Sequence, residues 1–323
     1  CIFYFTLGLP LAKLKSIGKK PIILFLVGAG GIIVGGPIAL VISHSIFPTE
    51  FNAESYKGMA TIAGSWIGGT ANQMALNAIF LPNSNELAKA VTVDVFFGET
   101  WLAILLFLIP FQQRINRYLK ASFDHQDISA HWEDDLTVKQ FTFLNLIQIL
   151  GLGLLITVLS TYLGKYIAEL VKISFLNHSF WTFLFCTLAG IGLGLSPIKK
   201  LYTAGGDVIS TLFLYFIIAS IGLKISLSHL FSTPLLLFTG FIWISIHGLA
   251  IFVVGKWIKA PYHYMAIASQ ANVGGIASAS VVATAISPSL APLGVILALL
   301  GYAIGTYGGY LSALLMQWVS LTY

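Results

Sequence analysis

Two apolar segments of the sequence each combine a glycine pair with amide and hydroxyl side chains. They are GSWIGGTANQMALNAIF, residues 64–80, and ASQANVGGIASASVVATAI, residues 268–286. A glycine break inside a membrane helix leaves backbone N–H and C=O groups unpaired, which costs several kcal/mol per group unless protein, water or a ligand pairs them. The N–H groups at such a break can bind an anion, and the carbonyls can bind a cation. The glycines at the predicted breaks are Gly68, Gly69, Gly274 and Gly275.

Neutral oxygen atoms accompany both breaks, and such oxygens suit a hard cation such as sodium. Runs of small residues such as GGIASASVVA are also typical of close helix packing, and serine can bond back to its own helix, so packing is the preferred interpretation of any single serine. The amides favour a binding role, because a primary amide in lipid needs several partners. The candidate ion- and substrate-binding residues are Thr70, Asn72, Gln73, Ser269, Gln270, Asn272 and Ser278.

Two acids, Asp94 and Glu99, follow the first break inside the apolar stretch AKAVTVDVFFGETWLAILLFLIP. Ionisable residues within a membrane span are rare and indicate function. Five residues along a helix place them about 140° apart, so only one of them needs to face the breaks. Glu99 lies deeper in the span and is preferred to Asp94 as a buried ion or proton ligand. The predicted sodium ligands are Asn72, Gln73, Gln270, Asn272 and Glu99, with Asp94 as a further charge partner.

The composition indicates that these segments lie in a membrane. Hydrophobic residues make up 57% of the 323 residues and charged residues 9%, against about 25% charged in soluble domains. Apolar runs of about 20 residues match the length of a membrane-spanning helix. They predict nine full spans and a partial one. The bases behind the net charge of +5 are spread among the loops, which indicates membrane orientation rather than a nucleic-acid partner.

The two halves of the sequence resemble each other. Residues 2–21 and 213–234 each run from an apolar stretch with Tyr-Phe through a lysine, Lys13 or Lys224, to a proline before the next span. Weak internal symmetry with a broken helix in each half is the pattern of secondary transporters built from repeats. We predict a first repeat at 1–110, a polar connecting loop at 111–140 and a second repeat at 141–323.

Enzyme signatures for zinc hydrolysis, serine hydrolysis or nucleotide binding do not occur in the sequence. The chain is therefore predicted not to be an enzyme, although an intramembrane enzyme using Asp94 and Glu99 is one alternative. A passive channel and a non-transporting receptor are the others. His247, alone on an apolar stretch, is expected to bond to a neighbour rather than relay protons.

The stretches GSWIGGTANQMALNA, VTVDVFF, SQANVGGIASASVVA and GYAIGTYGG together resemble the YjcL-like bacterial membrane proteins, catalogued as domain of unknown function group 819. That family is similar in plan to the superfamily of bile-acid sodium symporters and cation/proton antiporters. The resemblance implies inverted repeats, a core domain in which helices at 58–80 and 262–285 cross near the midplane, and a panel domain. It also implies that Asp94 is the acid after the first crossing helix. The first half departs from this plan by lacking about two initial helices.

We therefore predict an all-α polytopic membrane protein with two structural repeats, each with a broken, crossing helix, and with core and panel domains. The predicted function is secondary active transport of a small organic solute by alternating access, coupled to a cation gradient, with sodium preferred to protons. No cofactor is expected other than a bound sodium ion. The expected partners are the lipid bilayer of the bacterial inner membrane, the solute and a second copy in a homodimer, with no nucleic acid.

Overall fold

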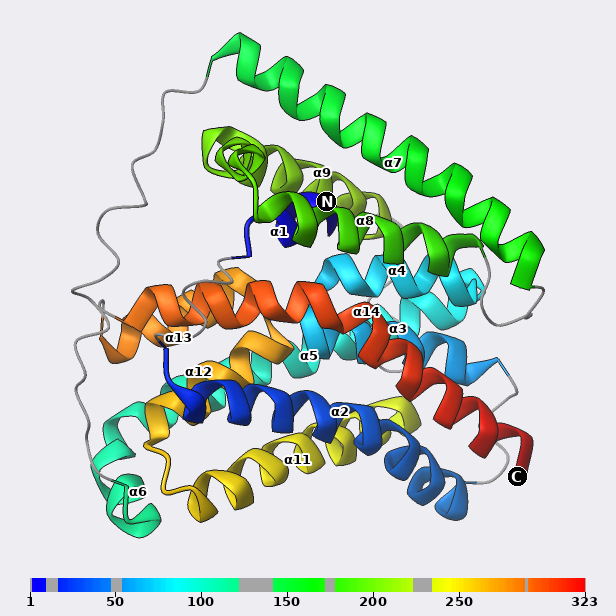
Figure 1. Ribbon diagram of the computed structural model, residues 1–323. Helices are drawn as coiled ribbons and strands as arrows, with labels where there is room; N and C mark the ends of the chain where they lie inside the picture. Colours follow the sequence, from blue (N-terminus) through cyan, green and yellow to red (C-terminus); the bar gives the residue numbers. More distant parts are fainter. Residues whose placement is uncertain are drawn as a thin grey trace. The chain divides into compact units, whose positions relative to one another are not determined.

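All regular structure in the described part of the chain is helical (Figure 1). The computed structural model describes residues 2–9, 17–47, 54–121, 142–171, 178–222, 234–287 and 290–322, with the backbone alone for 214, 215 and 217–222. Lys13, Lys224 and most of the predicted loop 111–140 lie outside these ranges. The loop's first residues are the last residue of the 3-10 turn η2 (Ile109–Phe111) and helix α6 (Gln112–Leu119).

The helices belong to two compact units. One unit comprises Cys1–Leu11 and Trp132–Gly222, and the other comprises Ala12–His131 and Leu223–Tyr323. The predicted repeats are defined by the similarity of the two halves of the sequence, whereas these units are defined by contacts between helices. The predicted repeat boundaries at 110 and 140 therefore stay a prediction. The helices of the first unit are α1 (Ile2–Leu7), α7 (Phe143–Val171), α8 (His178–Gly194) and α9 (Asp207–Gly222). Those of the second, besides α6, are α2 (Lys19–Ile46), α3 (Ser55–Gly68), α4 (Thr70–Phe80), α5 (Ser84–Leu108), α11 (Pro234–Trp257), α12 (Tyr262–Val273), α13 (Gly275–Ile286) and α14 (Ala291–Thr322).

Five described segments are long and apolar enough to cross a membrane, which makes the chain a multi-pass membrane protein. They are Lys19–Ile46, Ser84–Leu119, Phe143–Val171, Pro234–Trp257 and Ala291–Thr322.

A sixth span is formed if His178–Gly194 and Pro197–Phe213, which are bent by 102°, count as one. The nine predicted spans are more than this, because the stretches at 58–80 and 262–285 are each divided into half-helices and those at 179–196 and 205–223 are joined by the bend.

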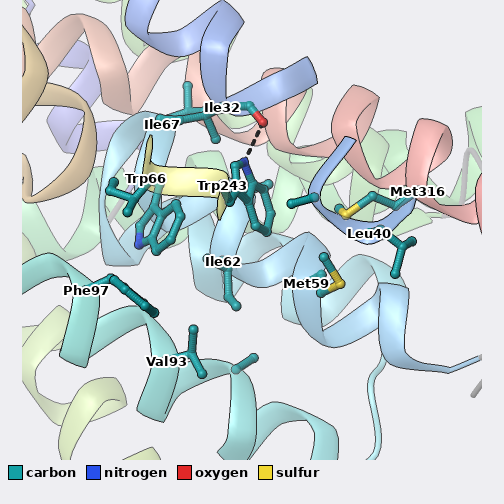
Figure 2. Packing of buried hydrophobic residues seen from close by; sticks show 14 of the residues in the cluster. Ile32, Leu40, Met59, Ile62, Trp66, Ile67, Val93, Phe97, Trp243 and Met316 are labelled. Carbon is teal, nitrogen blue, oxygen red and sulfur yellow. Dashed lines mark hydrogen bonds between the residues drawn. The ribbon is translucent and has the colours of Figure 1, made fainter. Parts of the chain in front are cut away.

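A cluster of large apolar side chains forms the core of the second unit (Figure 2). Trp66 and Trp243 are both fully buried, with ring centroids 5.2 Å apart. The indole N–H of Trp243 donates to the backbone oxygen of Ile32 at 2.8 Å, so the polar edge of this ring is paired inside the core (Figure 2). This cluster joins α2, α3, α5, α11 and α14, with Val273 at the end of α12, and so packs the helices around the two predicted breaks.

Helices α2 and α11 approach each other closely through glycine. A Cβ on Gly35 or Gly36 would overlap the Trp243 ring, and one on Gly31 would lie 3.2 Å from the Cα of His247. Small residues permit this close backbone approach where lipid supplies no hydrophobic force between helices.

The first unit is built around the N-terminal helix α1. Its Tyr4 hydroxyl donates to the backbone oxygen of Ile149 on α7 at 2.5 Å. On α8, a Cβ at Gly190 would overlap Thr6, so α1 and α8 also touch through a glycine. A wide turn at Tyr202–Gly206, with Gly205 at φ 118°, leads into α9.

Candidate functional site

Helix α3 reaches the first break packed against α14 through glycines on both helices. Each glycine set has a four-residue spacing, which places it on one helix face. A Cβ at Gly68 would overlap the backbone oxygen of Gly301, and one at Gly309 would lie 2.8 Å from the backbone nitrogen of Gly64. This backbone contact holds the end of α3 directly against the middle of α14. The glycines of the contact are Gly64, Gly68, Gly301, Gly305 and Gly309.

The first break lies at Gly69, between α3 and α4. Gly69 has φ 80° and ψ 176°, a conformation that only glycine adopts without strain. Its N–H still donates to the Ser65 oxygen at 2.6 Å. Helix α4 then begins at Thr70 with no side-chain hydrogen bond capping its N-terminus within the described residues.

The second break lies at Gly274 and Gly275, between α12 and α13, and it meets the first. Gly275 has φ 70°, and a Cβ placed on Gly69 would lie 3.6 Å from the Gly275 Cα. A Cβ on Gly275 would lie 3.4 Å from the hydroxyl of Tyr302, which also lies beside Gly69. The two interruptions therefore touch backbone to backbone, next to α14.

This contact brings together backbone groups of both polarities. The N-termini of α4 and α13 present N–H groups and partial positive charge, whereas the C-termini of α3 and α12 present carbonyls and partial negative charge. In the described part of the chain, neither N-terminus carries a side-chain cap. The junction can consequently bind ligands through donors and through acceptors.

Asp94 connects the two halves of the first broken helix. Its side chain is buried, and Oδ2 accepts hydrogen bonds from Ser65 Oγ at 2.9 Å and from Gln73 Nε2 at 3.0 Å. Ser65 lies on α3 and Gln73 on α4, so one carboxyl group of α5 holds the residues before and after Gly69.

Glu99 lies on the exposed part of α5. The structure thus reverses the predicted order of burial for the two acids, although it agrees that only one of them faces the breaks. The reason is helix rotation: depth along the span favoured Glu99, but the face that packs on α3 carries Asp94.

Asn72 is fully buried and hydrogen-bonded by protein groups. Its Nδ2 donates to the Gly68 oxygen at 2.6 Å, and its Oδ1 accepts from Thr306 Oγ1 at 2.6 Å. Asn72 therefore supplies a partner for a carbonyl that the break removes from the α3 ladder. Its predicted part in binding an ion stays a prediction, but these bonds already give it a structural one.

The amides near the second break differ, because they are buried with polar atoms that have no hydrogen-bond partner among the described residues. The unpaired atoms are Gln270 Oε1, both polar atoms of Asn272, and Ser278 Oγ. A Cβ on Gly274 would overlap Gln270 Nε2 and Ser278 Oγ, so both side chains lie over the break. Asn272 Oδ1 lies instead next to Gly28 of α2. Gln270 thus lies over the second break, whereas Asn272 lies beside α2.

Ser269 is held by two aromatic side chains. Trp101 Nε1 donates to its Oγ at 2.8 Å, and His247 Nε2 lies 2.8 Å from the same oxygen. The other ring nitrogen of His247 donates to the Gly28 carbonyl at 2.9 Å. His247 is thus bonded to neighbours, as the sequence predicts.

A comparison with protein-family models places the whole of this site inside one family. The model described as "Protein of unknown function (DUF819)" matches residues 1–319. The chain belongs to this family. No curated protein and no solved structure matches the DUF819 chain.

The sequence did not predict two residues that hydrogen-bond to predicted site residues, Trp101 to Ser269 and Thr306 to Asn72. Trp101 lies seven residues after Asp94, a spacing that repeats a helix face. Thr306 directly follows Gly305 in the α14 glycine series, but no local pattern in the sequence links it to Asn72.

Proposed function

We propose that the protein is a secondary active transporter that couples a cation gradient to the movement of a small organic solute by alternating access. Sodium is the preferred coupling ion, and protons are the alternative. The bilayer would be the bacterial inner membrane, and the working form a homodimer. The observation that carries this function is the buried Asp94 carboxyl group, which binds both halves of a broken membrane helix.

A buried acid between half-helices is suited to coupling. A carboxylate inside a membrane protein needs a cation, a proton or hydrogen-bond donors to offset its lost hydration. Here the donors come from opposite sides of the break, Ser65 on α3 and Gln73 on α4. A cation that binds Asp94 competes with these hydrogen bonds and so weakens the link between Asp94 and the two half-helices α3 and α4.

The solute would bind at the junction of the two breaks. Uncapped N–H groups of α4 and α13 meet there, and Gln270 and Ser278 lie over Gly274 with polar atoms unpaired among the described residues. Buried polar atoms without partners are costly, and a ligand with donors and acceptors would satisfy them. Similarity in plan to bile-acid sodium symporters remains a prediction.

The test is the thermal stability of the purified protein in detergent, titrated with sodium chloride against choline chloride at constant ionic strength. A ligand that binds only the folded state, at a concentration one hundred times its Kd, raises the free energy of unfolding by about 2.7 kcal/mol. Asp94→Asn should abolish a sodium-specific rise, whereas Glu99→Gln, with its exposed side chain on the same helix, should retain it.

An equal sodium response in Asp94→Asn and wild type would contradict the site. Stability that ignores sodium but changes with pH only when Asp94 is present would assign the coupling to protons. Solute flux in vesicles at fixed stoichiometry with the ion would separate this transporter from a passive channel.

A further inference from the structure

Helix α5 contacts both broken helices through side chains on one of its faces. Asp94 and Trp101 are seven residues apart, which is about 20° short of two full turns and about 10.5 Å along the helix axis. They therefore point in nearly the same direction from α5. Glu99, on the exposed part of the helix, does not share this face.

The two contacts are to equivalent places near the breaks. Asp94 accepts from Ser65, four residues before Gly69, and Trp101 donates to Ser269, five residues before Gly274. Both serines are buried. Helix α5 thus binds the half-helix that precedes each break, close to its end.

Trp101 is tightly seated. A Cβ on Gly248 of α11 would overlap the Trp101 ring, and the ring lies edge-on to His247 with centroids 6.0 Å apart. Because a carbonyl only accepts, His247 Nδ1 donates to Gly28, and Nε2 can then accept the Ser269 hydroxyl proton. The resulting bonds run in one direction, from Trp101 through Ser269 and His247 to the α2 backbone.

We propose that α5 couples the two breaks and that Trp101 is the positioning residue that makes the coupling. A cation at Asp94 alters the hold of α5 on α3 and α4, and Trp101 transmits the displacement of α5 to α12. The accessibility of the first turn of α13 then follows the occupancy of Asp94. This coupling rests on the proposed function, because it requires a cation at Asp94.

The experiment places a reporter thiol beyond the second break. Ala277→Cys puts it on an exposed position in the first turn of α13, in a background in which Cys1 and Cys186 are replaced by alanine. Maleimide labelling is timed in sodium chloride and in choline chloride, and melting of the same samples reports ion binding. With Trp101 present, sodium should change the labelling rate by about fivefold or more, the usual size of coupling between sites.

Trp101→Phe keeps an aromatic ring but removes the N–H donor. We expect it to abolish the sodium effect on labelling while the sodium-induced rise in melting temperature remains. Trp318→Phe, on an exposed face of α14, is the matched control and should behave as the reporter parent does. Trp101→Leu also removes the donor, adds no hydroxyl, and replaces the phenylalanine variant if that variant does not fold.

The outcomes separate the two inferences. A sodium-induced rise together with an unchanged labelling response in the Trp101 variants overturns the coupling and leaves the proposed function standing. The coupling is also overturned if sodium raises the melting temperature of the parent without affecting its labelling. If melting of the parent responds neither to sodium nor, through Asp94, to pH, the proposed function is overturned and, with it, the coupling.

Discussion

Asn72→Ala should destabilise the folded protein rather than only remove an ion ligand. The Asn72 side chain is fully buried and pairs the Gly68 carbonyl and the Thr306 hydroxyl. Without it, the Gly68 carbonyl stays unpaired in the interior, which costs about 1–3 kcal/mol. The Thr306 hydroxyl can turn back to its own helix, so its loss is near the average of about 0.6 kcal/mol for bonds between membrane helices. Together these give a loss of about 1.6–3.6 kcal/mol.

The assay is equilibrium unfolding in mixed micelles of dodecyl maltoside and SDS, followed by tryptophan fluorescence. Asn77→Ala is the matched control, because Asn77 lies on the same half-helix but is partly exposed. It should change the unfolding free energy by no more than about 0.5 kcal/mol. Thr306→Val should lower the free energy of unfolding by less than Asn72→Ala does, since the Gly68 carbonyl keeps its hydrogen bond to Asn72. If Asn72→Ala unfolds at the same SDS fraction as Asn77→Ala, the structural role of this amide is refuted.

Two further predictions concern close packing in the second unit. Gly68→Ala should cost about 3 kcal/mol or more, because the new Cβ overlaps the Gly301 backbone; Gly98→Ala, where no atom lies within 4 Å of the new Cβ, should be neutral or stabilising by up to about 1 kcal/mol. Size-exclusion profiles and melting temperatures compare the pair, and equal losses would contradict the glycine contact. Trp243→Phe should cost about 2 kcal/mol through the lost bond to Ile32 and the space left by the smaller ring, measured by the same SDS titration, and an unchanged unfolding free energy would show that this bond contributes nothing.

The fold class and the places of the two interruptions can be predicted from sequence because both depend on local properties. Long apolar runs predict membrane helices, and the glycine pairs stand where the structure ends α3 at Gly68 and starts α13 at Gly275. The span count could not be predicted in the same way. Half-helices and a sharply bent pair have the composition of full spans, so hydropathy does not distinguish them.

The partners of individual polar residues depend on contacts far apart in sequence. Nothing local to Asn72 shows that Thr306, on another helix, pairs it, or that Asn272 stays unpaired among the described residues. Similarly, the choice between Asp94 and Glu99 depends on which face of α5 meets α3. Residue type therefore identifies the candidate binding residues, and only packing shows which of them are already hydrogen-bonded to other protein groups.

The glycine contact between α2 and α11 also limits how the second unit can change shape. The Trp243 ring fills the space left by Gly35 and Gly36, and its N–H is bonded to the α2 backbone one turn earlier. A slide or rotation of α2 along α11 would drive this ring into the backbone and break that bond. The two helices therefore behave as a fixed frame, against which α5 and the half-helices beside the breaks would move.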